Sequence, residues 1–383
     1  MEGTSTVSTS YGFVSTYPPT QCGLATFTAA LFSELVSGSG DDGLVVRLVE
    51  SPQPRPAPEV KAQLIAGDSV SMRGATAALN GCDVAIVQHE FGVYGGPDGS
   101  EVLPLLDMLQ IPCVVIVHTV LTSPTTSQRA VLEAVMAKAD AVVVMSTTAR
   151  DRLAAGYAVD MRNVHVIPHG APDAHARAVS APMFRTGQPT VLSWGLLGPG
   201  KGIEWGIKAF AKLSGLVPAP RYVIAGQTHP KVLANEGEAY RMRLNEQVRR
   251  LGLGASVQFE GSYRDAMSLS ALVRQADVVL LPYDSTEQVT SGVLIEAVAA
   301  GKPVVATEFP HAVELLGGGV GLLVPHQDPS AMAEALRTVL TRSDLAAGMA
   351  RAAAATAEQL RWPAVAARYR DVSSKLIRAG VAA

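Results

Sequence analysis

Short apolar runs rich in β-branched residues alternate with helix-length amphipathic segments along the chain, and this pattern restricts its possible folds most strongly. In the first half the runs are DVAIVQ, CVVIVHT, DAVVVMS and VHVIP, separated by patterns such as SQRAVLEAVMAKA. In the second half they are TVLSWG, RYVIAG, VQFEG, DVVLLPY, PVVAT and GLLVP. Such runs are typical of strands buried on both faces, and their alternation with helices predicts an α/β fold of βαβ units with parallel sheets.

A stretch rich in Ala and Pro, APDAHARAVSAPMFRTGQP, separates the two halves at residues 171–189. Because 383 residues exceed the usual size of one hydrophobic core, we interpret this stretch as a linker between two domains. The predicted domains are residues 1–178 and 179–361. The tail LRWPAVAARYRDVSSKL has apolar residues at helical spacing and predicts a terminal helix.

Composition favours a small-molecule partner over a nucleic acid. The net charge is −3 and no long Lys/Arg block occurs, so no nucleic-acid footprint is expected. An odd number of cysteines, Cys22, Cys82 and Cys113, does not fit a disulfide framework, and the N-terminus lacks a signal-peptide pattern, so a cytoplasmic location is expected. The apolar runs are shorter than the roughly 20 residues of a membrane span, which leaves only peripheral membrane contact open.

The segment TEQVTSGVLIEAVAAGKPVVA, residues 286–306, predicts a loop that opens a helix. Free backbone amides and the helix dipole at Ser291 and Gly292 would attract phosphate, and the missing side chain of Gly292 allows close approach. Glu296 follows about one turn later, where a carboxylate could bind a ribose diol. The alternative is an ordinary solvated helix glutamate.

A second phosphate candidate is VLSWGLLGPGKGIEWGIKAF, in which a strand ending at Trp194 leads through a glycine-rich loop to a helix. Lys201 in this loop offers a positive point charge. The glycines from Gly195 onward could instead serve only a tight turn between strand and helix.

Two histidines fall where predicted parallel strands end, at the edge where open α/β sheets bind ligands. His118 ends CVVIVH, and His89 ends the preceding strand with Glu90 beside it. Single histidines at such points are often hydrogen-bonded core residues. The loop PPTQCGLATF, with Cys22 and Gly23, is either a plain turn or a surface for phosphates or an acceptor.

Several motifs that mark other enzyme classes do not occur in this sequence. It has no HExxH, no CxxC pair, no Walker lysine motif and no GxSxG, and no GxGxxG follows the first strand. No Asp-x-Asp pair stands at a strand end to hold a metal. We therefore expect neither a bound metal nor a cofactor.

Taken together, these residues resemble glycosyltransferase family 4, the glycosyl transferases group 1, which are retaining enzymes of the GT-B fold. The resemblance runs over nearly the whole chain. It rests on the CGLATF loop, VIVH at His118, VIPHGAPD ending at Asp173, GLLGPGKG at 195–202 and SGVLIEAVAAGKPVV at 291–305. It implies two Rossmann-like domains whose sheets face a central cleft, with residues 362–383 crossing back to the first domain.

The resemblance also implies the activity, transfer of a hexose from a UDP- or GDP-linked donor to an acceptor hydroxyl with retention of configuration. The C-terminal domain would hold the donor, and the N-terminal domain a carbohydrate, lipid or small-molecule acceptor. By the same analogy Glu296 binds ribose, Lys201 binds the diphosphate, and His118 contacts the transferred sugar. The resemblance assigns the distal phosphate to the four backbone amides of residues 291–294. The implied catalytic residues are His118, Lys201 and Gln288; the donor-binding residues are Gly195, Lys201, Glu287, Gln288, Thr290, Ser291, Gly292, Val293, Leu294 and Glu296; the acceptor-side residues are Cys22, Gly23, His89 and Glu90.

Two positions depart from the family pattern. Members carry a glutamate eight positions before the ribose-binding one, and here Gln288 stands there, with Glu287 one residue earlier. Members also carry an arginine after the strand-ending glycine, and here Leu196 stands at that position. The missing positive charge would have to come from Arg264 or another basic side chain. These departures keep one rival open, a nucleotide-sugar-binding protein without turnover. A second rival keeps the fold but changes the reaction to that of a GT-B sugar phosphorylase or epimerase. The donor, the acceptor, the linkage and the oligomeric state stay open.

Overall fold

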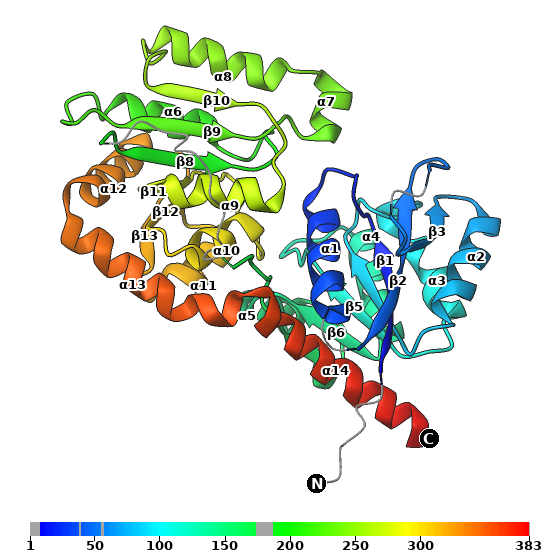
Figure 1. Ribbon diagram of the computed structural model, residues 1–383. Coiled ribbons are helices and arrows are strands. Elements are labelled where there is room, and N and C mark those ends of the chain that lie inside the picture. Colours follow the sequence, from blue (N-terminus) through cyan, green and yellow to red (C-terminus); the bar gives the residue numbers. More distant parts are fainter. Residues whose placement is uncertain (1–7, 38–39, 55–56, 174–186, 383) are drawn as a thin grey trace. The chain divides into compact units, whose positions relative to one another are not determined.

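The computed structural model describes residues 8–37, 40–54, 57–173 and 187–382. The chain forms two compact units, one made of Met1–His169 with Trp362–Ala383 and the other of Gly170–Arg361. The predicted boundary between residues 178 and 179 lies outside the described residues. Each unit contains one parallel sheet covered by helices (Figure 1), which confirms the predicted α/β fold with two Rossmann-like domains.

The sheet of the first unit has the strand order β3-β2-β1-β4-β5-β6-β7. The four runs expected in the first half form β4 to β7. The pattern does not single out β2 and β3, because Arg47 interrupts β2 and the edge strand β3 carries Lys61 and Gln63. The strands are β1 (Ser10–Ser15), β2 (Asp42–Val49), β3 (Val60–Ile65), β4 (Val84–His89), β5 (Cys113–Val117), β6 (Ala141–Val144) and β7 (Val164–Val166).

The C-terminal helix α14 (Trp362–Ala382) belongs to the first unit, as the sequence predicted. It packs beside α1 (Gly23–Val36), where Phe27, Trp362 and Tyr369 join one hydrophobic core on the same face of the sheet. Crossovers between parallel strands are right-handed, and the chain runs in opposite directions along the sheet before and after the reversal. The helices that connect β4 to β7 are therefore expected on the opposite face from α1, which connects β1 to β2. The other helical segments are α2 (Ser69–Leu79), η1 (Pro97–Gly99), α3 (Val102–Met108), α4 (Thr126–Lys138), α5 (Thr147–Gly156) and η2 (Met161–Asn163).

The sheet of the second unit has the order β10-β9-β8-β11-β12-β13, and all its pairings are parallel. Every run that the sequence pattern predicted in this half forms one of these strands. They are β8 (Thr190–Trp194), β9 (Arg221–Ala225), β10 (Val257–Glu260), β11 (Val278–Leu281), β12 (Val304–Thr307) and β13 (Gly321–Val324).

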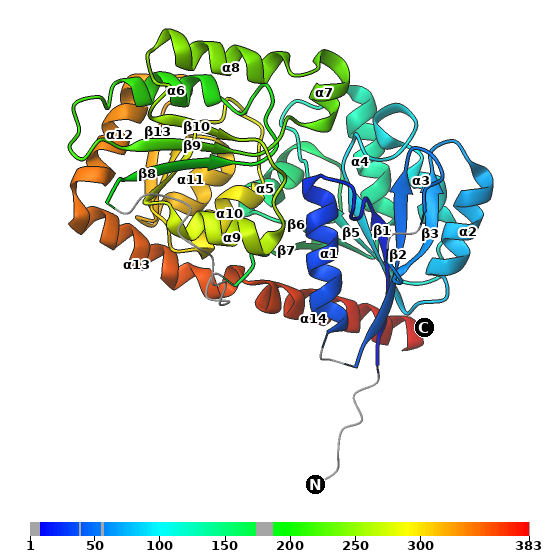
Figure 2. The same cartoon turned by 45° about the horizontal axis from the view of Figure 1, so that its top comes forward.

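Helices cover both faces of this second sheet (Figure 2). Two hydrophobic cores lie between the sheet and these helices. One core contains residues of α9 (Ala266–Gln275), α10 (Gly292–Ala299) and α11 (Pro310–Leu316). The other contains residues of α6 (Ile203–Ala211), α8 (Ala239–Arg250) and α12 (Pro329–Thr341). The remaining helices of this unit are α7 (Pro230–Glu236) and α13 (Ser343–Leu360), and α13 contributes to both cores.

Each sheet has one point at which the strand order reverses. It lies between β1 and β4 in the first unit and between β8 and β11 in the second. Open parallel sheets form a crevice at the carboxyl ends of such strands and bind ligands there. In the second unit the loops at this point are residues 195–202 and 282–291, which contain the two predicted phosphate motifs.

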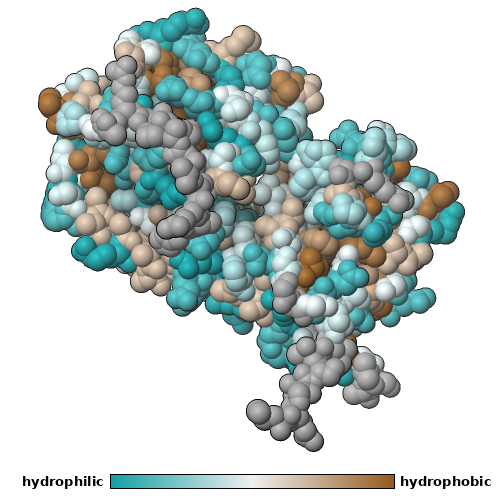
Figure 3. All heavy atoms as spheres, in the orientation of Figure 1, coloured by the Kyte–Doolittle hydropathy of each residue, from teal (hydrophilic) through white to brown (hydrophobic). Residues whose placement is uncertain are grey.

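None of the helices in the described part of the chain is long and apolar enough to span a membrane. On the face drawn in Figure 3, exposed apolar residues appear as separate patches among hydrophilic ones. Cys22, Cys82 and Cys113 are free thiols, and the latter two are buried.

Candidate functional site

The glycine-rich loop after β8 packs closely against the segment that follows β11. Gly202 has a φ of +62°, and a Cβ atom there would lie 1.7 Å from the carbonyl oxygen of Pro282. The amide of Asp284 donates a hydrogen bond to the carbonyl of Gly200 at 2.9 Å. Gly195 has a φ of +120°, and its Cβ would lie 3.6 Å from Cγ2 of Val293 in the first turn of α10. The two predicted phosphate motifs are therefore brought together.

At the N-terminus of α10, two backbone amides have no acceptor among the described residues. Ser291 is the N-cap, and its Oγ accepts a hydrogen bond from the amide of Leu294 at 3.2 Å. The amide of Ser291 donates to Nδ1 of His311 at 2.9 Å. Of the four amides that the resemblance assigned to the distal phosphate, those of Ser291 and Leu294 are thus already bonded. The amides of Gly292 and Val293 bond no other described residue, and they lie at the positive end of the helix dipole.

Lys201 lies over an aromatic side chain that follows β11. Its Nζ is 4.3 Å from the ring centroid of Tyr283, and this ring stacks on Phe309 with centroids 5.1 Å apart. Tyr283 and Phe309 are buried, so the ring is a fixed support for the lysine. The ammonium group is thereby held beside the glycine-rich loop.

Glu296 is not a solvated helix glutamate. Its side chain is half-buried, and Oε2 accepts a hydrogen bond from Nε1 of Trp194 at 3.0 Å. Burial raises the pKa of this carboxyl to about 7, and the hydrogen bond from Trp194 acts in the opposite direction. The carboxylate therefore has one oxygen held by the protein at the end of β8.

The segment between β11 and α10 carries the remaining donor-side candidates. Nε2 of Gln288 donates to the carbonyl of Thr290 at 3.0 Å, and the carbonyl of Gln288 accepts from His311 at 3.3 Å. The amide of Glu287 donates to Oγ of Ser285 at 3.4 Å. Both side chains are half-buried, so either one remains a candidate for the sugar-contacting position.

Two arginines near this region could compensate for Leu196. Arg264 pairs with Glu260 at 3.5 Å, so its charge is partly neutralised. Arg241 of α8 donates a hydrogen bond to the carbonyl oxygen of Gly226. Gly226 in turn packs against the glycine-rich loop, because a Cβ atom there would lie 1.9 Å from the carbonyl oxygen of Gly195. Gly226 therefore lies between Arg241 and the glycine-rich loop and contacts both of them. The sequence did not indicate this arrangement. The described residues contain no group of three or more His, Cys, Asp or Glu side chains arranged to hold a metal.

In the first unit, His118 lies in an aromatic cluster that includes both α1 and α14. The ring of Phe27 contacts His118, His169 and Trp362 edge-on, with centroids 5.2, 4.9 and 5.1 Å away. Nε2 of His118 and Oε1 of Gln88 are hydrogen-bonded at 2.5 Å. Burial, with smaller effects of His169 and His89, lowers the pKa of His118 to about 3, so the ring is neutral near pH 7.

The four acceptor-side candidates differ in exposure. His89 is fully buried, and neither ring nitrogen has a hydrogen-bond partner among the described residues, so the ring presents no surface to a ligand. Glu90 accepts from the Thr119 hydroxyl at 2.5 Å. Cys22 caps α1 by accepting from Ala25 at 3.4 Å, and Gly23 begins the helix. Apart from His89, these residues line the point where the strand order reverses.

Two family models match the chain in succession. The model described as "Glycosyltransferase Family 4" matches residues 36–175, and the model "Glycosyl transferases group 1" matches residues 178–356. The chain belongs to glycosyltransferase family 4. The resemblance inferred from the sequence motifs is confirmed, and with it the assignment as an enzyme.

Curated relatives of this glycosyltransferase act on inositol compounds, according to their names. The D-inositol 3-phosphate glycosyltransferase of Corynebacterium jeikeium is 29% identical over 305 residues, covering 72% of this chain and 70% of the relative. The phosphatidyl-myo-inositol mannosyltransferase of Mycolicibacterium smegmatis is 32% identical over 184 residues, covering 48% and 44%. The match to the second relative thus spans less than half of its length.

Solved structures share the fold of this glycosyltransferase over nearly its entire length. Sucrose-phosphate synthase from Thermosynechococcus elongatus has a TM-score of 0.75 at 20% identity, covering 97% of this chain and 100% of the other. Anabaena HepE in complex with UDP-glucose has a TM-score of 0.75 at 19% identity, covering 96% and 100%. At these identities the likeness shows the GT-B fold alone.

Two aromatic residues of this glycosyltransferase contact its candidate donor residues without belonging to the predicted set. Trp194 bonds Glu296, and Tyr283 supports Lys201. Each lies at or just after the carboxyl end of one of the two strands at the reversal, β8 and β11. Position at a strand end was the available signal, but a buried aromatic residue there reads first as part of the core.

Proposed function

We propose that this glycosyltransferase moves a hexose from a UDP- or GDP-linked donor to an acceptor hydroxyl with retention of configuration. The observation that carries the proposal is the convergence of three features on the point between β8 and β11 where the strand order reverses. These are the loop at Gly195–Lys201, the unbonded amides of Gly292 and Val293, and the carboxylate of Glu296. Positive charge, amide donors and a carboxylate are what a nucleoside diphosphate requires.

Each part of the donor has a proposed partner in the second unit. The free oxygen of Glu296 accepts from the ribose hydroxyls. The amides of Gly292 and Val293 bind the distal phosphate. Lys201, whose ammonium group stays over the Tyr283 ring, binds the diphosphate as a positive point charge. Gln288, or Glu287 in its place, contacts the sugar, with Thr290 beside them.

The proposed chemistry is a displacement on the face from which the diphosphate departs. The acceptor oxygen forms a bond to the anomeric carbon as the bond between that carbon and the phosphate oxygen breaks. The acceptor proton passes to the departing phosphate oxygen. Lys201 and the α10 amides stabilise the charge that develops on the diphosphate, which is usually the largest catalytic contribution. This scheme requires no metal or cofactor.

The first unit is the proposed acceptor domain. His118 is neutral and is oriented by Gln88, so it can donate or accept a hydrogen bond at the transferred sugar. Glu90, Cys22 and Gly23 lie at the reversal point of this sheet. Because the named relatives act on inositol compounds, hydroxyls of a polyol are the first acceptor class to test.

The proposal is tested with purified full-length protein. Thermal shift against a panel of nucleoside diphosphates identifies the base, because ligand at 100 times its Kd adds about 2.7 kcal/mol of apparent stability. The matching nucleotide sugars are then incubated with inositol, inositol phosphate and simple sugars, and NMR assigns the anomer of any product. Formation of an α-linked glycoside from an α-linked donor supports the proposal.

The same assays separate the rivals. Stabilisation by a nucleotide sugar with neither transfer nor donor hydrolysis would identify a binding protein without turnover. Release of sugar 1-phosphate from a glycoside on addition of inorganic phosphate would identify a phosphorylase. An inverted product would refute retention.

A further inference from the structure

Trp194 is a buried residue that contacts the candidate donor site through its only polar atom. Alternation along β8 places Leu192 and Trp194 in the same core as α10. Trp194 is 5% exposed, and its Nε1 donates to Oε2 of Glu296 at 3.0 Å. An indole has one donor and no acceptor, so this hydrogen bond is the only one that the Trp194 side chain can donate. Because the ring is packed in the core, the bond fixes the position of Oε2 and thereby orients the carboxylate of Glu296.

The other oxygen of Glu296, Oε1, accepts no hydrogen bond from another described residue, and the side chain is half-buried. A ribose diol needs a carboxylate in one orientation. A glutamate has several rotatable bonds, and ordering it on binding would cost conformational entropy. A carboxylate already held by a packed indole avoids much of that cost.

We propose that Trp194 is a positioning residue for ribose recognition: its indole N–H holds the carboxylate of Glu296 so that the second oxygen is presented to the ribose hydroxyls. This inference rests on the proposed function and extends it to a residue that does not touch the donor. A purely structural Trp194 would affect stability, but it would not affect discrimination between ribose and deoxyribose.

The experiment compares the full-length protein with Trp194→Phe and Glu296→Gln by isothermal titration calorimetry. The probes are whichever of UDP or GDP binds, together with its 2′-deoxy form. The wild type is expected to prefer the ribonucleotide by about 10-fold, the value of one hydrogen bond to a charged group. Trp194→Phe should reduce that preference about 5-fold by weakening ribonucleotide binding, with the Kd of the deoxynucleotide unchanged.

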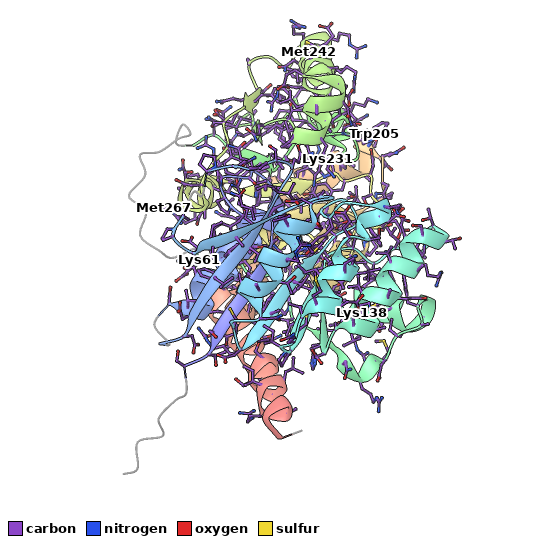
Figure 4. All side chains as sticks on the ribbon, turned by 90° about the vertical axis from the view of Figure 1, so that its right-hand side faces the viewer. Lys61, Lys138, Trp205, Lys231, Met242 and Met267 are labelled. Carbon is purple, nitrogen blue, oxygen red and sulfur yellow. The ribbon has the colours of Figure 1, made fainter. Side chains whose placement is uncertain are left out.

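The matched control is Trp205→Phe. Trp205, labelled in Figure 4, also donates its indole N–H to a carboxylate, Oδ2 of Asp284 at 3.1 Å, and it is half-buried. Its variant loses a bond of the same kind and should retain the wild-type preference for ribose. Glu296→Asp, which withdraws the carboxylate from Trp194 without changing the indole, should lose the preference and serves if Trp194→Phe does not fold.

A pH series adds a second readout. The hydrogen bond from Trp194 favours the ionised carboxylate against the effect of burial. Trp194→Phe should therefore shift the rise in ribonucleotide affinity to higher pH, a shift that lost packing alone would not produce. If Trp194→Phe keeps the full preference while Glu296→Gln loses it, the positioning role is refuted. If the wild type binds both nucleotides equally, or neither, the ribose assignment of the proposed function fails instead.

Discussion

The ammonium nitrogen of Lys201 lies 4.3 Å from the ring centroid of Tyr283. The lysine comes from the loop after β8 and the tyrosine from the segment after β11, so this contact joins the two strands at which the sheet order reverses. A cation held on an aromatic face keeps its charge and remains available to an anion. The contact therefore holds Lys201, the residue proposed to bind the diphosphate, beside the proposed phosphate site.

Replacing Lys201 by Ala should lower turnover more than 10-fold, because a charge-assisted contact of about 1.5 to 3 kcal/mol is lost in the transition state. Lys208→Ala is the control, since Nζ of Lys208 lies 4.0 Å from the ring centroid of Trp205 and this lysine is exposed on α6. Steady-state kinetics of both variants check the prediction. Equal activity of the two variants would contradict the role of Lys201.

At Tyr283 the ring and the hydroxyl are expected to have separable effects. The hydroxyl is buried and has no hydrogen-bond partner among the described residues, so Tyr283→Phe should keep activity and cost no stability. Tyr283→Leu removes the aromatic face and should lower turnover about 3- to 10-fold, in line with a cation–π contact of about 0.5 to 1.5 kcal/mol. Activity and thermal unfolding of the two variants are measured together. A loss of activity in Tyr283→Phe would show that the hydroxyl, not the ring, is required.

Glu296 should couple stability and binding to pH in opposite directions. Its folded pKa of about 7 lies above the ordinary value, so the folded state retains a proton that the unfolded chain has lost, and stability falls as pH rises toward 7. Donor binding needs the ionised form and should strengthen over the same range. Glu296→Gln should therefore be about 1 kcal/mol more stable than wild type near pH 8, yet bind donor poorly. Denaturant unfolding at several pH values checks this, and a stability difference that does not change with pH would contradict it.

Buried His89 should make the protein sensitive to acid. Burial lowers the pKa of His89 from its ordinary value of 6.5 to about 4. Between these two pH values the imidazole is protonated in the unfolded chain but stays neutral in the folded state. Stability conferred by the neutral ring is present above pH 6.5 and is lost as the pH falls toward 4. His89→Leu should show a smaller loss between pH 7.5 and pH 5, by about 1 to 2 kcal/mol. Urea unfolding at both pH values is the measurement, and parallel losses in variant and wild type would count against the assignment.

Gly226 and Gly200 should respond differently to alanine. At Gly226, φ is +133° and a Cβ would lie 1.9 Å from the carbonyl oxygen of Gly195, so Gly226→Ala should cost about 3 kcal/mol or more. At Gly200, φ is +89°, but apart from its two chain neighbours no other described residue has an atom within 4 Å of the Cβ position, so Gly200→Ala should cost only about 1 to 2 kcal/mol. Thermal unfolding of both variants tests the difference. Equal costs would show that the close approach of Gly226 to the loop is not as described.

The period of the hydrophobic pattern was sufficient to predict most of the fold. Runs such as DVVLLPY and PVVAT are apolar because β11 and β12 are buried on both faces, and each formed a strand. The pattern failed where tertiary contacts override it. Arg47 interrupts β2 in the sequence, but it is buried because it donates to the carbonyl of Tyr17 and the hydroxyl of Thr20.

The candidate site could be predicted in outline but not in its partners. The SGVLIEA segment indicated the helix and the place where it begins, at Ser291 and Gly292. It could not show that His311, twenty residues later in the chain, takes the amide of Ser291. The proposed roles of Trp194 and Tyr283 likewise depend on β8 and β11 being neighbours in the sheet. The order of strands in a sheet cannot be predicted from the sequence of a single segment.

The account depends most on the two amides at the start of α10 that bond no other described residue, and Gly292→Pro removes one of them. Proline lacks the amide hydrogen but is tolerated at the first position of a helix, and Ser291 before it is already extended. Ala266→Pro at the first position of α9, after the extended Asp265, is the matched control. The measurement is the Kd of the nucleoside diphosphate and of the bare nucleoside by calorimetry. We predict that Gly292→Pro weakens diphosphate binding about 10-fold or more, leaves nucleoside binding unchanged, and differs in this from Ala266→Pro. Undiminished diphosphate binding in Gly292→Pro would contradict the assignment of this helix terminus as the phosphate site.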